Sequence, residues 1–242
     1  MNVRCIALTA AAATAVMTSA HAGTVDVEFT GTGLGRSVRT HLDGRAQNVF
    51  AGQLRHAFSN GTEQCSELDG GYLTFCTELT QYVTSQESPY ECLPLEAAPP
   101  SHAMGAVRAQ AMRDLYAYAD GAQFATSGTS DNRDLAAAFQ IAVWEIVYDY
   151  DGTASSLDAA AGNLRVTKTD GNPLSGGVSG YLDSFFGGVG TGAELPELFA
   201  VTNSQYQDQL VMIPLPLPLA MGAVGLAAVI WRRRVLARRA AG

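Results

Sequence analysis

The chain has 242 residues, of which 47% are hydrophobic and 16% are charged. Between Gly23 and Met212 nine basic residues face 23 acidic residues, which gives this part a net charge of −14. A charge of that sign repels phosphate polymers and anionic lipid surfaces, so it argues against nucleic acid as a partner. About 190 residues are enough for one domain with a sizeable core.

The N-terminus has the three zones of a secretory signal peptide. Arg4 provides a positive charge, an Ala-rich apolar run extends from Cys5 to about Thr18, and Ala20 and Ala22 supply small residues for a peptidase. The apolar run is too short to span a bilayer. Residues 1–22 are therefore predicted to be removed during export, and the exported domain is predicted over 23–212.

The first half of this domain is predicted to form strands. Alternating or β-rich patterns cover 24–30, 37–42, 47–58 and 71–83, and they are separated by glycines at 31–35 and by turn dipeptides such as Asp43-Gly44. The glycine stretch predicts a turn. Residues 85–102 are Pro-rich and aperiodic, which predicts a loop that contains Cys92.

The second half is predicted to be mainly helical. Apolar residues recur at helical spacing over 103–119, and 135–148 is apolar on nearly every side, which predicts a helix buried in the middle of the domain. Residues 155–192 are Gly-rich with a short element at 181–186, and 197–212 reads as a final strand or strand pair. Together these elements predict an α+β fold: an antiparallel β-sheet or sandwich with a small helical subdomain around one buried helix.

The C-terminus predicts a membrane-spanning helix. Leu215 to Trp231 carries no charge, and Arg232, Arg233 and Arg234 follow it, which places this end in the cytoplasm. A Pro motif, Ile213-Pro214-Leu215-Pro216, precedes the helix. This three-part order resembles the PEP-CTERM exosortase sorting signal, in a form close to its VPLPA variant. The resemblance implies a Gram-negative bacterium, an exosortase-like processing enzyme that acts within 213–242, and transfer to the cell surface or extracellular matrix. The alternative is a plain single-span anchor.

Three cysteines remain after signal removal, and an odd number in an oxidising compartment needs an explanation. Cys65, Cys76 and Cys92 allow three single pairings, and the sequence does not choose among them. Cys76 is the remaining thiol if Cys65 and Cys92 pair. Gln140 lies on the predicted buried helix among apolar neighbours, where an amide costs free energy unless it finds partners. A Cys thiolate can attack a Gln carbonyl and expel ammonia, which forms an internal thioester.

The segments Phe75-Cys76-Thr77-Glu78-Leu79 and Phe139-Gln140-Ile141-Ala142-Val143-Trp144 resemble the thioester (TQXA-type) domains of bacterial surface proteins. The order also agrees: the Cys strand, an intervening helix, then the Gln helix. Phe139 stands where the family motif has Thr. The resemblance implies that Cys76 is the thiol and Gln140 the acyl donor of a single-use electrophile. A surface or matrix macromolecule, protein or polysaccharide, would attack it through an amine or hydroxyl.

Nearby residues have expected roles in this chemistry. Phe139, Trp144 and Tyr148 are the candidate walls of a partly dry pocket, and Glu78 and Glu145 are the candidates for proton transfer. Lys168 is the only lysine, so few amines of the chain itself would quench the bond. No cofactor and no metal ligand set is predicted.

Other interpretations remain open. The chain would be a non-covalent structural or binding protein of the envelope or biofilm matrix if Gln140 only bonds to backbone. Cys76 with His41, His56 or His102 would mimic a cysteine protease, but no family signature surrounds them. A turnover enzyme is not predicted, because no paired acid and base and no metal cluster stands out.

Overall fold

The computed structural model describes residues 23–119, 130–195 and 198–212. Within them the chain forms an antiparallel sheet and three α-helices, which confirms the α+β prediction. The elements in chain order are β1 (Thr24–Leu42), β2 (Arg45–Ser59), β3 (Gly70–Cys76), β4 (Ser88–Pro94), α1 (Gly105–Ala119), α2 (Ser130–Tyr148), β5 (Leu164–Lys168), α3 (Gly176–Gly188), β6 (Leu198–Thr202) and β7 (Gln209–Met212).

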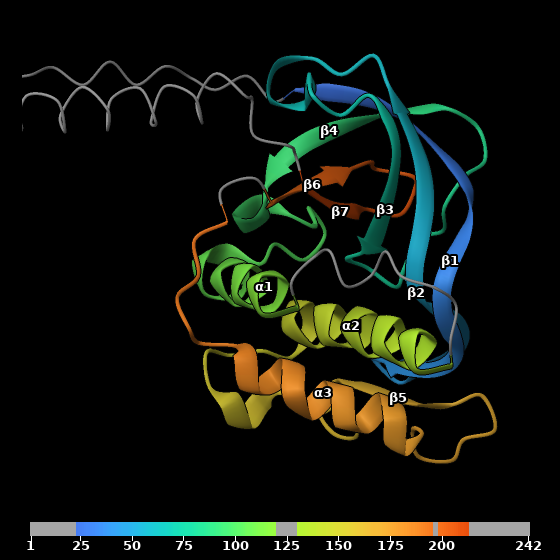
Figure 1. The fold of residues 1–242 in the computed structure, drawn as a ribbon, viewed down its shortest axis with the longest axis vertical. Helices are drawn as coiled ribbons and strands as arrows, with labels where there is room; N and C mark the ends of the chain where they lie inside the picture. Colours follow the sequence, from blue (N-terminus) through green and yellow to red (C-terminus); the bar gives the residue numbers. More distant parts are fainter. Residues whose placement is uncertain (1–22, 120–129, 196–197, 213–242) are drawn as a thin grey trace, which may run out of the picture.

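The sheet closes on itself because β1 has pairing partners on both edges. The strand order is β2-β3-β7-β6-β4-β1-β5, and β1 also pairs with β2, so six strands form a ring. One edge of β1 pairs with β2, and the other pairs with β4 through Thr24–Val27 and with β5 through Val38–Leu42. The strand half lies above the helical half in Figure 1, with the N-terminal part of β1 in the ring and its C-terminal part beside β5.

Glycines allow β1 to bend, and the turn predicted over residues 31–35 is wrong. The β1–β2 pairing continues through this stretch, with register shifts between Phe29 and Gly31 and between Thr32 and Gly35. A Cβ on Gly35 would collide with the Ala51 carbonyl, and Gly52 has a φ of +153°. The two strands therefore approach more closely than side chains permit, which increases their local twist.

Helix α2 is the centre of the core, as the sequence predicted. Every residue from Ala136 to Val147 is buried, and α2 contacts β1, β2, β3, β5, α1 and α3. Helix α2 runs between the strands above it and α3 below it (Figure 1). A helix enclosed in this way must be apolar around its circumference, and any polar group that it carries needs an internal partner.

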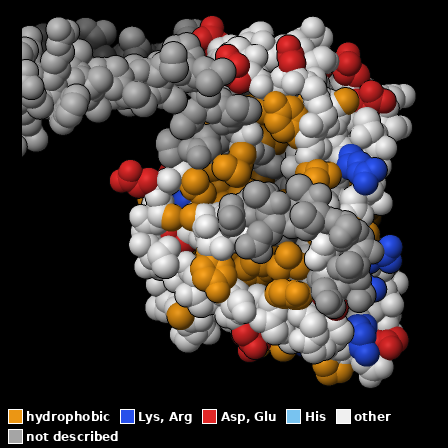
Figure 2. Space-filling model, in the orientation of Figure 1, with side chains coloured by type: hydrophobic (Ala, Val, Ile, Leu, Met, Phe, Trp, Pro, Cys, Tyr) orange, Lys and Arg blue, Asp and Glu red, His pale blue; other side chains and the backbone are white. Residues whose placement is uncertain are grey.

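The surface separates hydrophobic from acidic side chains on the face drawn in Figure 2. Hydrophobic side chains gather at the centre of this face, and acidic side chains line its upper edge, over the strand half. The exposed large hydrophobic residues among those described are Leu73, Tyr82, Val107 and Tyr118.

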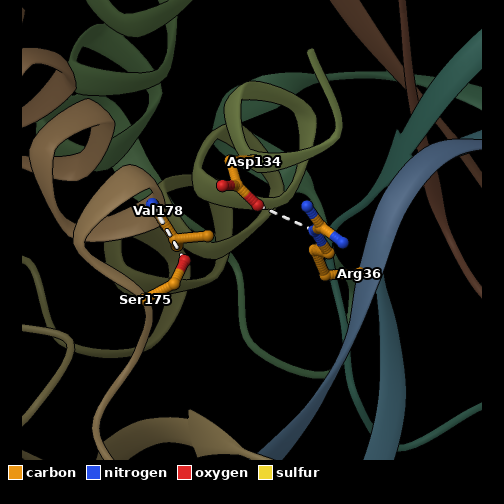
Figure 3. Close-up of polar contacts among 4 residues, drawn as sticks. All are labelled: Arg36, Asp134, Ser175 and Val178. Carbon is orange, nitrogen blue, oxygen red and sulfur yellow. Dashed lines mark hydrogen bonds and ion pairs between the residues drawn. The ribbon is translucent and has the colours of Figure 1, made fainter. Parts of the chain in front are cut away.

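Two polar contacts fix the ends of the helical layer (Figure 3). Arg36 Nε on β1 donates to Asp134 Oδ1 on α2 at 2.7 Å, and Ser175 Oγ accepts from the Val178 N–H at 3.3 Å as the N-cap of α3. The cap satisfies one of the free N–H groups in the first turn of α3.

Several predicted boundaries are corrected by the structure. The predicted loop over 85–102 contains β4, which pairs with both β1 and β6. The predicted strand over 71–83 ends at Cys76, and the region 155–192 contains β5 and a longer helix, α3. Sheet pairing and packing on α2 decide these segments, and local pattern does not report either.

The predicted signal peptide at 1–22 and the predicted sorting signal at 213–242 lie outside the described residues. Within the three described ranges, no helix has the length and apolarity that a membrane span needs.

Candidate functional site

The side-chain amide of Gln140, on α2, lies directly against Cys76, the last residue of β3. Its Oε1 accepts from the Cys76 backbone N–H at 3.0 Å, and its Nε2 donates to the Cys76 carbonyl oxygen at 2.8 Å. The Cys76 Sγ lies 3.5 Å from the same Oε1. The structure therefore brings together the two residues that the sequence singled out, 64 positions apart.

The geometry follows from how β3 ends. Cys76 is the last residue of β3, and one edge of it pairs with Gln209 on β7. On the other edge the pairing with β2 stops at Thr74. The N–H and C=O of one residue in an extended strand point to the same side, so the Gln140 amide fills the place of a missing strand partner.

Burial controls the chemistry of the thiol. Cys76 is 3% exposed and Gln140 is 0% exposed. Burial raises the pKa of the Cys76 thiol to about 12, the indole N–H of Trp144 opposes this rise, and Glu78 adds to it. Among the described residues, Trp144 Nε1 has no hydrogen-bond acceptor within bonding distance. The thiol is therefore protonated at neutral pH, and a sulfur anion formed here would have one indole donor near it.

A cavity of about 190 Å³ reaches Cys76 from outside the core. Its apolar walls include Phe29, Val49, Phe50, Leu79, Val83 and Trp144. The prediction for Trp144 agrees with this lining, but the other two predicted walls lie elsewhere. Phe139 packs against Phe75, Tyr116 and Phe185 in the core, because it projects from a different side of α2 than Trp144.

Tyr148, the third predicted wall, holds the backbone instead. Its hydroxyl accepts from the Leu79 N–H at 3.0 Å, and Gln47 Nε2 donates to the Leu79 carbonyl at 2.8 Å. Gln207 Nε2 donates to the Glu78 carbonyl at 2.9 Å. These contacts provide hydrogen-bond partners for the backbone where the chain leaves the sheet after Cys76, and so they help to position the cysteine.

Sequence reasoning missed this role for Gln47. The sequence predicts only the strand that carries Gln47, because a polar residue on a strand gives no signal that its side-chain amide bonds to a distant backbone group.

Neither predicted proton-transfer residue contacts the sulfur. The Glu78 side chain lines a separate cavity, where its Oε2 accepts from Thr80 and Ser101. Burial raises the Glu78 pKa. Glu145 is 0% exposed, and burial together with the charges of Asp149 and Asp158 raises its pKa to about 9. Five positions beyond Gln140 on a helix of 3.6 residues per turn, Glu145 points away from Cys76.

The other two cysteines form a disulfide, Cys65–Cys92, and Cys76 is free and buried. The disulfide joins the segment before β3 to β4. It lies within a hydrophobic cluster of the strand half that also contains Val25, Phe58 and Tyr90. Of the three pairings that the sequence left open, the structure selects this one, and it leaves the Cys76 sulfur available for Gln140.

The histidines do not form a protease site with Cys76. His56 bonds to Thr74 Oγ1 at 2.9 Å, and burial lowers its pKa to about 4. His102 contacts Arg108 at 3.0 Å, and His41 lines a third cavity. No hydrogen bond joins any of the three to Cys76 in the described part of the chain.

No group of three or more His, Cys, Asp or Glu side chains within the described residues could hold a metal ion. Comparison of the chain with protein-family models, curated proteins and solved structures found no match.

Proposed function

We propose that Cys76 and Gln140 form an internal thioester. We further propose that this chain is an exported surface protein that uses the thioester to attach covalently to an amine- or hydroxyl-bearing partner. The observation that carries this proposal is the Gln140 amide, held at both ends by the Cys76 backbone with the only free thiol of the described residues beside it. Reacting atoms held in this way need little further ordering before they react.

The first step balances within the pair. Sγ attacks the Gln140 carbonyl carbon, which lies one bond of about 1.23 Å from Oε1. The Sγ–C bond forms, the C–Nε2 bond breaks, and the thiol proton leaves with nitrogen as ammonia. The Cys76 N–H, 3.0 Å from Oε1, is placed to stabilise the oxyanion of the tetrahedral intermediate.

The second step consumes the thioester. A partner amine attacks the same carbon, the new C–N bond forms, and the C–S bond breaks. The amine proton passes to sulfur, because a thiol with a pKa of about 12 is protonated at neutral pH. The partner then remains attached to Gln140 through an amide, or through an ester if a hydroxyl attacks. The reaction occurs once for each chain, so the protein is proposed as an adhesin and not as a turnover enzyme.

The place of action is proposed from the two ends of the chain. A signal peptide at 1–22 and a PEP-CTERM-like signal at 213–242 would deliver the domain through the inner membrane to the cell surface or matrix, with cleavage by an exosortase-like enzyme. Export would also provide the oxidising compartment that the disulfide between Cys65 and Cys92 needs.

Intact mass of the purified protein tests the proposal. The thioester gives a mass lower than the sequence by one ammonia, after allowance for the disulfide. Cys76→Ala and Gln140→Glu abolish the deficit. Methylamine adds one methylamine to the thioester form at Gln140, so the mass ends one CH2 unit above that of the sequence. Gln110→Ala, on α1, is the matched control and keeps the deficit. A full mass with an alkylatable Cys76 in the wild-type protein refutes the thioester.

One observation supports a second candidate function. Both polar atoms of the Gln140 amide already have backbone partners, so the residue also fits a purely structural tie between β3 and α2. The protein would then be a non-covalent structural or binding protein of the envelope or biofilm matrix. Full mass together with a destabilised Gln140→Ala variant distinguishes this alternative from the thioester.

A further inference from the structure

A second cavity, of about 550 Å³, lies beside the Cys76 site and is acidic. Three carboxylates, Glu78, Glu91 and Asp208, line it together with hydroxyl and amide groups. Among the described lining residues there is no Lys, Arg or His. The cavity therefore offers acceptors and negative charge without a positive group of its own.

Two acceptor atoms of the residues that line this cavity have no hydrogen-bond partner. Glu78 is 1% exposed, and its Oε1 is buried without a hydrogen bond, whereas its Oε2 accepts from Thr80 and Ser101. The Oε1 of Gln81 is also buried without a partner, although its Nε2 donates to the Ser204 carbonyl at 3.0 Å. Buried acceptors without donors are uncommon in folded proteins, and each one calls for an explanation such as an absent water or ion.

The carboxylates also repel each other. Burial raises the pKa of Asp208 to about 7, and the nearby Glu78 raises it further in the same direction. Asp208 is 2% exposed and accepts one backbone N–H, from Asn203 at 2.8 Å. A cation bound between them would relieve this repulsion and supply donors to the unpartnered oxygens.

The acidic cavity shares a wall residue with the reactive one. Gln81 lines both cavities, and Gln207, which lines the Cys76 cavity, holds the Glu78 carbonyl. A ligand in the acidic cavity would therefore lie next to a group that enters toward Cys76.

We propose that the acidic cavity binds a primary alkylammonium group of the partner, such as a lysine side chain, and so brings a second amine of that partner to the thioester. This assignment rests on the proposed function for its purpose, though not for the binding itself. The reactive cavity favours lysine over an amino sugar. It holds about 190 Å³ and most of its lining residues are apolar, so it suits an unbranched methylene stem, whereas many of a sugar's hydroxyls would lose their hydrogen bonds there.

The test compares three five-carbon probes: 1,5-diaminopentane, n-pentylamine and 1,5-pentanediol. Binding is measured by calorimetry on the full-length Cys76→Ala variant, which forms no thioester. We expect the diamine and pentylamine to bind, each through one ammonium group, and the diol not to bind. Glu78→Gln, added to this variant, should weaken diamine binding about tenfold, the scale of one lost charge-assisted hydrogen bond. Glu87→Gln, an exposed glutamate that does not line the cavity, is the matched control and should leave binding unchanged.

Asp208→Asn provides a second variant, because its amide oxygen still accepts from Asn203 and the fold is kept. It should also weaken diamine binding. No diamine binding, equal binding of diamine and diol, or tighter binding of a glucosamine oligomer overturns the assignment.

In the wild-type protein the same cavity predicts about tenfold faster thioester loss with the diamine than with pentylamine, and Glu78→Gln removes that preference. Diamine binding to a protein of full mass would leave the cavity assignment standing while the thioester fails. A thioester that reacts equally with both amines would leave the proposed function standing while the assignment of the acidic cavity fails.

Discussion

Methylamine should open the thioester and destabilise the fold, because it removes a cross-link without removing a residue. The bond would join positions that are 64 residues apart. In the chain-entropy model a covalent loop of that length stabilises a protein by about 4 kcal/mol, between the values for 15-residue and 100-residue loops. The local contacts change little. The thioester has lost Nε2, and the trans N-methyl amide carries its methyl on the Oε1 side, so neither form donates to the Cys76 carbonyl, whereas Oε1 can accept from the Cys76 N–H in both.

The assay is urea unfolding of the protein before and after methylamine at one pH, with intact mass reporting the extent of conversion. At a slope of about 2 kcal/mol per molar urea the midpoint should fall by about 2 M. Cys76→Ala treated in the same way is the control and should not change. Full conversion by mass with an unchanged midpoint would refute the placement of the bond between β3 and α2.

Three further predictions concern stability. Glu145→Gln should flatten the pH dependence of the free energy of unfolding. The pKa of Glu145 is raised from 4.5 to about 9, so the stability that the protonated side chain provides is complete below pH 4.5. It falls by about 1.4 kcal/mol per pH unit as the pH rises toward 9. Denaturant midpoints of both proteins at pH 5 and pH 8 measure this, and parallel pH profiles would contradict it. The double variant Cys65→Ala/Cys92→Ala should lose about 3 to 4 kcal/mol, the value for a loop closed over 27 residues; urea unfolding checks it, and reducing agent should have no effect on the variant's midpoint. Ser175→Ala should cost about 1 kcal/mol through loss of the α3 cap, which a thermal melt would detect, and an unchanged melt would mean that water replaces the cap.

The local sequence pattern predicts an element correctly where the surroundings of that element are uniform or where its own residues set the backbone conformation. The buried helix is an example, since a run from Ala136 to Val147 with almost no polar residue fits only a fully enclosed α2. The Asp43-Gly44 turn is another, because both residues adopt positive φ, 50° and 75°, as a two-residue hairpin requires.

Local pattern failed where pairing decided the conformation. Pro89 and Pro94 argued for a loop, yet β4 forms because β1 and β6 pair with its two edges. The glycines at 31, 33 and 35 argue for a turn, yet β1 continues through them because the pairing with β2 resumes after each register shift. Proline and glycine signals describe the chain alone and do not include a neighbouring strand.

For the site, residue type and resemblance single out Cys76 and Gln140, and Trp144 lies in the wall of the cavity that reaches Cys76. Phe139, Tyr148, Glu78 and Glu145 were chosen for their closeness in sequence, and the structure gives each of them a different role. Residues adjacent in sequence on a helix or at a strand end point in different directions, so nearness along the chain did not predict nearness to the sulfur.

The sequence by itself determined the inventory: an acidic domain with one lysine, an odd number of cysteines and a single amide in an apolar helix. The tertiary structure decided that β3 ends one strand partner short, that the Gln140 amide completes it, and that an acidic cavity shares a wall with the reactive one. Those facts depend on where β2 leaves β3 and how α2 crosses beneath, and such long-range pairings are set by the packing of the whole chain.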